Sequence, residues 1–228
     1  ISMDAEIPMN KIKSGLLLKS EWKYIENNLD ELRDLPLYID DTISIEITEL
    51  IEKFRVLKIE KNVNLFIIDS LQSITVSEDQ NIEQISKILK ELTRELEITI
   101  IATSQLNRQV ESRGGAKRPL MSDLKGSGNL EENADIIILL YRPEYYEITQ
   151  DEDGLDCRGL AEIIIAKNRG GNTETIKTRF LNVFGLFQDY EEIAFDSQWT
   201  KCCPVNKNEK NTIYNTEHTN IKQPWSIC

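Results

Sequence analysis

The fold is decided by residues 98–142, which read ITIIATSQLNRQVESRGGAKRPLMSDLKGSGNLEENADIIILLYR. Two apolar, β-branched runs, 98–103 and 136–140, flank a polar loop that carries four glycines and several cationic side chains. Continuous apolar runs are typical of buried parallel strands, which present functional groups from the loops at their carboxyl ends. The loop is too long and too charged to be a plain connector, so we expect it to be functional.

The chain before this stretch alternates between predicted helices and strands. Residues 1–18 contain the breakers Pro8 and Gly15 and predict irregular structure with a turn at 14–15. Apolar residues at helical spacing predict helices from an N-cap at Ser20 to before Pro36, over 47–57 and over 82–96, and apolar runs predict strands at 37–39 and 63–68. The order predicts an α/β domain with a largely parallel sheet flanked by helices.

The chain after this stretch predicts an extension of the sheet. Apolar runs at 161–166, 175–181 and 186–190 have no helix between them, and glycine-containing turns at 170–171 and 183–185 separate them. The last two runs therefore predict a β-hairpin. From about residue 195 the sequence is polar and has no apolar period, so we expect a domain over 1–194 and a disordered tail over 195–228.

Composition indicates a globular protein without a membrane span. The chain has 228 residues, a net charge of −12 and no apolar run near the ~20 residues that a span needs. Residues 26–52 carry a net charge of −8, whereas residues 108–125 and 165–180 each carry +3. An acidic protein with two basic patches fits one that meets phosphates at chosen points, although such clusters are also common in solvated loops.

Four positions suggest phosphate chemistry. Asp69 closes a buried strand, where nucleoside triphosphatases hold Mg²⁺, and Gln105 follows the neighbouring strand, where it could sense a terminal phosphate. Lys167 and Arg169 lie at alternate positions after the run 161–166, so both point the same way. Each feature also has an ordinary explanation, because acidic residues start turns, glutamines cap helices, and exposed strand ends often carry cations.

Eight short motifs follow one another along the chain. They are YIDDT (38–42), IIDSLQ (67–72), SQLNR (104–108), KRPLMSDL (117–124), SG (127–128), AD (134–135), LYRPEYY (140–146) and IIAKNRGG (164–171). In combination they resemble the motor domain of DnaB-type hexameric replicative DNA helicases over about residues 1–190. The resemblance implies a RecA-like fold with ATP and Mg²⁺ bound between adjacent subunits of a homo-hexameric ring.

The resemblance also implies residue roles. Asp69 matches the Walker B aspartate that positions Mg²⁺, and Gln105 matches the residue that senses the γ-phosphate. Arg169 matches an arginine finger that reaches the neighbour's nucleotide, with Lys167 as its companion cation. The region that contacts single-stranded DNA in the central channel matches residues within 108–128, namely Arg108, Arg113, Lys117, Arg118, Lys125, Gly126, Ser127 and Gly128.

Some family features differ or are missing. The family's Arg-Glu-Ser-Gly motif reads Lys-Gly-Ser-Gly over 125–128, and Ser70 replaces the aromatic residue after the Walker B aspartate. No Gly-x-x-x-x-Gly-Lys-Ser/Thr loop occurs in the sequence, and the family's catalytic glutamate and primase-binding collar domain are missing too. We therefore expect the carboxyl-terminal portion of a helicase, without ATPase activity of its own.

Three functions remain open from the sequence. The first is part of an ATP-dependent helicase that unwinds DNA at the replication fork by translocating on single-stranded DNA. The second is a degenerate subunit or remnant that binds partners or DNA without hydrolysing ATP. The third, another RecA-like ATPase, is disfavoured by the motifs at 117–124 and 140–146. Family likeness names primase and a helicase loader as candidate partners. The expected location is the bacterial cytoplasm at the nucleoid or, because the abundance of Ile, Asn and Lys indicates an AT-rich genome, which could be an organellar one, the plastid stroma.

Overall fold

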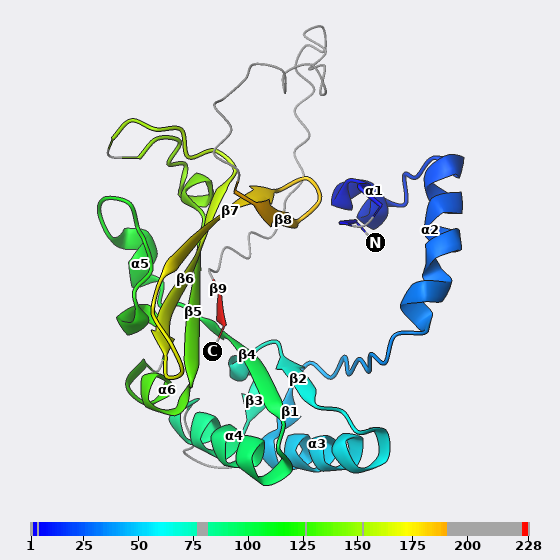
Figure 1. Cartoon of the computed structure of the whole chain (residues 1–228), viewed down its shortest axis with the longest axis vertical. Coiled ribbons are helices and arrows are strands. Elements are labelled where there is room, and N and C mark those ends of the chain that lie inside the picture. Colours follow the sequence, from blue (N-terminus) through cyan, green and yellow to red (C-terminus); the bar gives the residue numbers. More distant parts are fainter. Residues whose placement is uncertain are drawn as a thin grey trace, which may run out of the picture.

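The computed structural model describes residues 2–3, 5–76, 82–125, 127–151, 153–190 and 225–227 (Figure 1). The α-helices are α1 (Met9–Ser14), α2 (Lys19–Arg33), α3 (Ile47–Lys61), α4 (Ile82–Leu96), α5 (Gln109–Ser112) and α6 (Ser127–Asn133), and the 3-10 helices are η1 (Leu71–Ser73), η2 (Met121–Asp123) and η3 (Pro143–Tyr146). The strands are β1 (Ile45–Glu46), β2 (Leu65–Ile68), β3 (Ile74–Thr75), β4 (Thr99–Gln105), β5 (Ile136–Tyr141), β6 (Leu160–Asn168), β7 (Thr175–Leu181), β8 (Leu186–Asp189) and β9 (Trp225–Ile227).

Most of the strands form one seven-stranded sheet in the order β2-β4-β9-β5-β6-β7-β8. The pair β2–β4 is parallel, and so is the small separate pair β1–β3. The hairpin of β7 and β8 extends the sheet as predicted, and the α/β class is confirmed. Parallel pairing is less extensive than expected, because the neighbours from β9 to β8 all pair antiparallel.

Among the described residues, strands β4 and β5 are linked by backbone pairing through β9. Strand β9 pairs with Thr103–Gln105 of β4 on one side and with Ile138 and Leu139 of β5 on the other. Most of the predicted disordered tail lies outside the described residues. For residues 225–227 the prediction of disorder is wrong, because these residues form β9. Their backbone groups pair with the facing edges of β4 and β5, whose hydrogen-bonding groups would otherwise lack partners.

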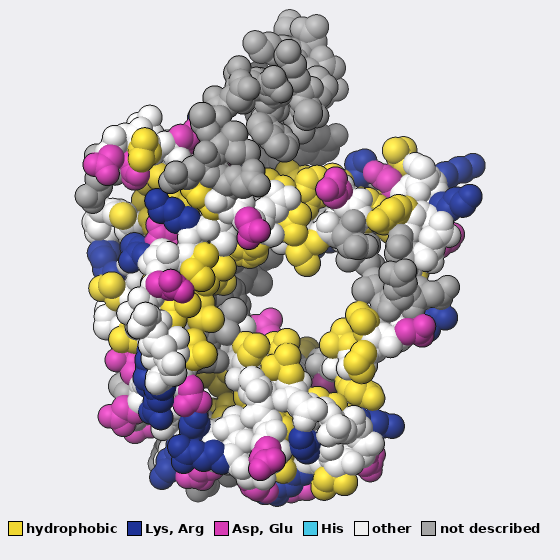
Figure 2. Space-filling model, viewed as in Figure 1, with side chains coloured by type: hydrophobic (Ala, Val, Ile, Leu, Met, Phe, Trp, Pro, Cys, Tyr) yellow, Lys and Arg dark blue, Asp and Glu magenta, His cyan; other side chains and the backbone are white. Residues whose placement is uncertain are grey.

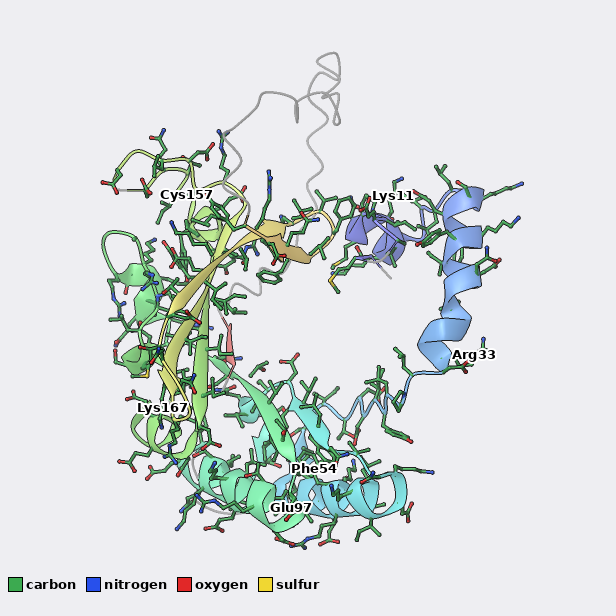
Figure 3. All side chains as sticks on the ribbon, viewed as in Figure 1. Lys11, Arg33, Phe54, Glu97, Cys157 and Lys167 are labelled. Carbon is green, nitrogen blue, oxygen red and sulfur yellow. The ribbon has the colours of Figure 1, made fainter. Side chains whose placement is uncertain are left out.

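Helices α3 and α4 lie side by side and pack against the β2–β4 part of the sheet (Figure 1). Ile85, Leu89 and Leu92 share one face of α4 and are buried there. Phe54 of α3 is labelled in Figure 3. Its ring stacks on that of Phe66 of β2, with ring centroids 3.9 Å apart. The apolar side chains that predicted these helices and strands therefore pack together in one hydrophobic core.

The amino-terminal part differs most from the prediction. Residues 9–14 form α1 rather than irregular structure, and the helix ends at Gly15, which has a φ of 72°. The predicted strand at 37–39 is absent because no strand pairs with it within the described residues, and Ile39 remains 83% exposed. An opening partly bordered by hydrophobic side chains separates the α1–α2 part from the α3–α4 layer (Figure 2).

Candidate functional site

The carboxyl ends of β2 and β4 bring two oxygen ligands together. Asp69 follows β2 and is exposed, while Thr103 lies on the adjacent parallel strand. The Thr103 hydroxyl donates a hydrogen bond of 2.7 Å to Oδ1 of Asp69. The other carboxylate oxygen can take a metal ion, and a hydroxyl beside a carboxylate is a suitable oxygen pair for Mg²⁺.

Gln105 lies at the end of β4, close to η1. Its backbone N–H lies 3.4 Å from Oε1 of Gln72, and its carbonyl accepts a hydrogen bond of 3.2 Å from the backbone of Lys125. Nε2 of Gln72 donates to the hydroxyl of the fully buried Ser104 over 3.0 Å. Gln105 is thus held where β4, η1 and the long loop meet, next to the strand that carries Thr103.

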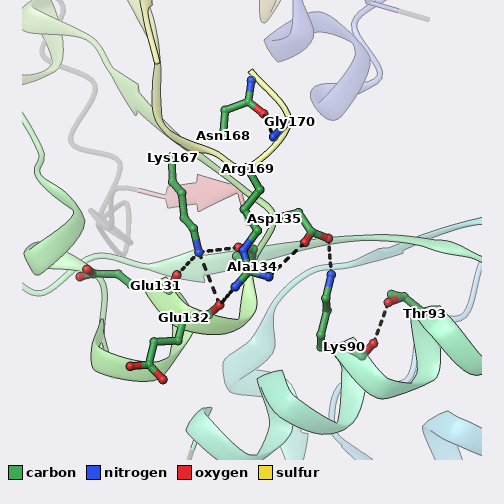
Figure 4. A network of polar contacts seen from close by, with 10 residues as sticks. All are labelled: Lys90, Thr93, Glu131, Glu132, Ala134, Asp135, Lys167, Asn168, Arg169 and Gly170. Atoms are coloured by element: carbon green, nitrogen blue, oxygen red, sulfur yellow. Dashed lines mark hydrogen bonds and ion pairs between the residues drawn. The ribbon is translucent and has the colours of Figure 1, made fainter. Parts of the chain in front are cut away.

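Lys167 and Arg169 lie together against the carboxyl-terminal end of α6 (Figure 4). Nζ of Lys167 donates to the carbonyl of Ala134 over 2.7 Å and to those of Glu131 and Glu132. The Arg169 guanidinium also donates to the carbonyl of Glu132. Carbonyls at a helix end carry partial negative charge, which explains why two cations gather there. The predicted common direction of these side chains is confirmed.

Asp135 connects this cation pair to α4. The carbonyl of Asp135 accepts a hydrogen bond of 2.9 Å from the backbone N–H of Arg169, and its Oδ1 lies 3.8 Å from Nη1 of Arg169. Its other carboxylate oxygen pairs with Nζ of Lys90. The hydrogen bond from Lys90 lowers the pKa of Asp135, whereas burial lowers the pKa of Lys167.

The strand register separates Asp69 from Arg169. In the strand register Asp69 lies opposite Thr103, and Thr103 and Ile138 both lie opposite the same residue of β9. Arg169 instead bonds to Asp135, which directly precedes β5. The two residues are therefore offset by three residues, roughly 10 Å along the strands, and by four strand spacings, roughly 20 Å across the sheet. One phosphate group cannot contact both residues of the same chain.

Two arginines of the long loop are fixed by contacts within the chain. Arg113 pairs with Asp123, which is 5% exposed and also accepts a hydrogen bond of 2.7 Å from the backbone of Leu120. Nε of Arg118 lies 2.7 Å from Oε2 of Glu162. Another nitrogen of Arg118 donates to the Thr175 hydroxyl over 2.8 Å. The Arg113 pair lies within the loop, whereas the Arg118 contacts fasten the loop to β6 and β7.

The remaining residues of the predicted DNA contact surround these fixed points. Nζ of Lys117 lies 5.7 Å above the centre of the Tyr146 ring, and burial raises the pKa of Tyr146 to about 12. Arg108 and Lys125 are exposed. Ser127 and Gly128 begin α6, and Gly126 lies outside the described residues. The loop thus presents its cations in fixed and exposed positions along one folded segment.

The site contains part of what bound Mg²⁺ and ATP require. Asp69 and Thr103 offer hard oxygen ligands, and within the described part of the chain no three His, Cys, Asp or Glu side chains cluster so that they could hold a metal ion. Mg²⁺ is commonly held by one or two protein oxygens together with phosphates, so the pair fits that role. The sequence contains no Gly-x-x-x-x-Gly-Lys-Ser/Thr motif, the kind of loop whose backbone amides and lysine grip phosphates.

Four residues of the site have no role indicated by the sequence, namely Thr103, Gln72, Lys90 and Asp135. Thr103 could have been found, because residues at alternate positions of a strand share one face and Gln105 is two positions away. Asp135 lies directly before a predicted strand, a common place for a turn-forming residue. Nothing in its local sequence indicates that Lys90 of α4 and Arg169, just after β6, would meet there.

Comparisons with known proteins give one consistent result. Residues 1–189 match the family model described as the DnaB-like helicase C-terminal domain. The replicative DNA helicase DnaB of Geobacillus stearothermophilus is 37% identical over 201 residues, which cover 86% of this chain and 43% of that protein. The replicative DNA helicase DnaC of Bacillus subtilis is 36% identical over 194 residues, covering 82% of this chain and 41% of its own length.

Solved structures agree with the sequence comparison. A DnaB-like replicative helicase, studied with its interactions with primase, has a TM-score of 0.72 and 32% identity, and the match covers 83% of this chain and 46% of the other. A second solved structure, of an ATPase domain, also has a TM-score of 0.72, with 31% identity, and the match covers 83% of this chain and 68% of the other.

These matches confirm the expected RecA-like, DnaB-type fold. The chain spans less than half the length of the curated relatives it matches. None of the described helices is long and apolar enough to cross a membrane. From its family-model match over residues 1–189, the chain belongs to the family of DnaB-like helicase C-terminal domains.

Proposed function

We propose that this chain is the carboxyl-terminal motor portion of an ATP-dependent replicative DNA helicase that works as a homo-hexameric ring. Asp69 and Gln105 would face Mg²⁺ and the phosphates of one nucleotide. Arg169, with Lys167 beside it, would face the nucleotide of the adjacent subunit. When bound, ATP would supply the phosphoryl group, and Mg²⁺ would help Arg169 and Lys167 to neutralise the negative charge that develops on it.

The observation that carries this proposal is the separation of Asp69 from Arg169 along and across the sheet. Both residue types serve phosphoryl transfer, yet they lie roughly 20 Å apart in one chain, which rules out a shared phosphate within that chain. Two copies placed side by side can bring Arg169 of one copy to Asp69 of the next. An arginine supplied in this way is worth about 10³–10⁵ in rate because it stabilises charge in the transition state.

Single-stranded DNA is the proposed ligand of the loop within 108–128. Its positive net charge suits backbone phosphates, and contacts to phosphates carry affinity without reading the base sequence. Arg108 and Lys125 are exposed and can contact DNA without breaking a described ion pair. Arg113 and Arg118 would support the loop and add charge, because Asp123 and Glu162 hold their guanidinium groups.

A complementation assay tests this function. Subunits of the Geobacillus stearothermophilus relative, with alanine at the position matching Arg169, would be mixed with this chain, and native mass spectrometry would count mixed rings. We expect the unmodified chain to restore ATP hydrolysis, and Arg169→Ala to abolish that effect. Arg158→Ala is the matched control, because Arg158 is an exposed arginine that pairs with Asp156 and precedes β6, whereas Arg169 follows the other end of that strand.

The outcomes separate the two open functions. Restored hydrolysis in mixed rings supports the motor function. Mixed rings without restored hydrolysis would favour a non-catalytic subunit, and failure to form mixed rings would contradict the hexameric role. Primase and a helicase loader remain proposed partners of the whole ring, and pull-down of each with the mixed rings tests them separately.

A further inference from the structure

We propose that Asp135 is the positioning residue for Arg169, and that Lys90 holds Asp135 in place for this task. The inference rests on the proposed function, in which Arg169 meets a phosphate of the adjacent subunit. Asp135 itself would not touch the nucleotide. It would set the direction from which the Arg169 guanidinium is offered.

Asp135 holds Arg169 at two separate points. Its carbonyl accepts the backbone N–H of Arg169 over 2.9 Å, and its Oδ1 lies 3.8 Å from Nη1 of the same residue. The backbone contact fixes the start of the side chain, and the carboxylate attracts its far end. An arginine held at both ends loses less conformational freedom when it binds an anion.

Lys90 restrains Asp135 from the opposite side. Its Nζ pairs with the second carboxylate oxygen, and the Lys90 side chain is only 19% exposed. Because Lys90 belongs to α4, the Asp135 carboxylate that faces Arg169 is anchored to a helix of the core (Figure 4). A group supported by a rigid element keeps its geometry better than one supported by solvent.

Lys167 and the end of α6 complete the support. An ammonium group has three N–H donors, and Lys167 directs its group at the carbonyls of Glu131, Glu132 and Ala134. Lys167 therefore fixes the end of α6 next to Asp135. The Arg169 side chain is 48% exposed and borders an open pocket with Lys167, Met121 and the end of α6. Of the two cations, Arg169 is the one presented outward.

Glu132 offers a matched control for Asp135. Its described contacts with Arg169 and Lys167 use its main-chain carbonyl, which Glu132→Gln leaves unchanged. Glu132→Gln and Asp135→Asn each remove one negative charge from the same surroundings. Asp135 pairs directly with Arg169, so charge alone predicts that Asp135→Asn strengthens anion binding at least as much as Glu132→Gln. If Asp135 positions Arg169, Asp135→Asn should instead bind the anion more weakly than Glu132→Gln.

The experiment follows the Arg169 Nε–Hε signal of the full chain by NMR, with Arg169→Lys used to assign it. The unmodified chain and Glu132→Gln should show an ordered side chain in ¹⁵N relaxation. Asp135→Asn should lose much of this order, because only the Glu132 carbonyl then holds the guanidinium. Asp135→Glu, which keeps the carboxylate, should recover part of it. Backbone amide spectra of every variant show that the fold is kept.

Inorganic tripolyphosphate is then titrated into each variant. We expect it to shift the Arg169 signal, and to bind Asp135→Asn about fivefold more weakly than Glu132→Gln, because the free arginine must be ordered on binding. If Asp135→Asn keeps an ordered Arg169 and binds as tightly as Glu132→Gln or more tightly, the inference is wrong while the proposed function stands. If tripolyphosphate leaves the Arg169 signal of the unmodified chain unchanged, the phosphate role fails, and the inference with it.

Discussion

Thr103 donates its hydroxyl hydrogen to Oδ1 of Asp69 over 2.7 Å, which ties together the carboxyl ends of β4 and β2. The bond orients the carboxylate and leaves its second oxygen for a metal ion. Hydroxyl and carboxylate come from neighbouring strands of a packed sheet, so their geometry depends little on loop motion.

This pair should bind a divalent cation weakly in the chain alone. Mn²⁺, used as a paramagnetic substitute for Mg²⁺, is expected to broaden the amide NMR signals of Ser70 and Ser104. Asp69→Asn should abolish the broadening, and Thr103→Val, which keeps the shape without the hydroxyl, should reduce it several-fold. Asp189→Asn, at the exposed end of β8, is the control. Broadening that persists in Asp69→Asn would contradict the assignment.

Arg118→Ala and Arg108→Ala should differ in their effect on the stability of the fold but not in their effect on DNA binding. Arg118→Ala removes the contacts to Glu162 and Thr175 and should cost about 0.5 kcal/mol of unfolding free energy, whereas Arg108→Ala should cost almost nothing. In assembled rings, each change should weaken binding of a labelled oligo-dT and make its logarithmic salt dependence shallower by roughly 0.7. Fluorescence anisotropy at several salt concentrations measures the affinity for oligo-dT and its salt dependence. An unchanged salt slope would place that arginine away from DNA.

Leu130 should report how firmly α6 is docked. It is 1% exposed and lies beside a cavity of about 360 Å³ between α4, α6, β4 and β5. Leu130→Ala should lower the free energy of unfolding by about 3 kcal/mol, because it removes buried apolar contacts and enlarges that cavity. Urea denaturation measures the loss. Leu120→Ala, at a position 53% exposed, is the control and should cost less than about 1 kcal/mol; equal losses would contradict the packing described.

Much of the core was predictable because its signal is periodic. Helices α3 and α4 and strands β2, β4 and β5 lie where apolar spacing placed them, within a few residues. The meeting of Asp69 with the end of β4 followed from parallel strands that share one edge. The alternate spacing of Lys167 and Arg169 likewise predicted that they point the same way.

The other features of the fold and the site depend on contacts between segments distant in the sequence, which no local sequence pattern indicates. Lys167 binds main-chain carbonyls, which every residue has, so the sequence cannot indicate that α6 would supply them. Strand β9 has only three residues and pairs with segments distant in the sequence, so it has no period to detect. The predicted strand at 37–39 failed for the related reason that a strand requires a neighbour.

Ser226 should be sensitive to proline. Its backbone lies between those of Ser104 and Leu139, and it belongs to the only strand that joins β4 to β5 in the described part of the chain. Ser226→Pro removes an N–H from this junction and should speed amide hydrogen exchange at Ser104 and Leu139 by about tenfold or more. Ser226→Ala keeps the N–H and should leave exchange unchanged; equal exchange in both variants would exclude β9 from the sheet in solution.

The link between Lys90 and Asp135 should appear in the acid dependence of stability. The hydrogen bond from Lys90 is the main cause that lowers the pKa of Asp135, and the charges of Arg169 and Lys167 add to it. A group whose pKa is lower in the folded state stabilises the fold above its unfolded pKa, and this contribution is lost as the pH falls through the folded pKa. Stability should therefore decline below about pH 4, the ordinary range of an aspartate.

Lys90→Met should flatten the decline of stability at low pH. It removes the main cause of the lowered pKa of Asp135 while it keeps the length of the side chain. Urea denaturation between about pH 5 and pH 2.5 gives the free energy of unfolding at each pH, and the slope reports the difference in bound protons. Lys87→Met is the control, since Lys87 is an exposed lysine of the same helix α4. If both variants lose stability along the same curve as the unmodified chain, Lys90 does not hold Asp135 in solution, and Arg169 would lack its support from the core.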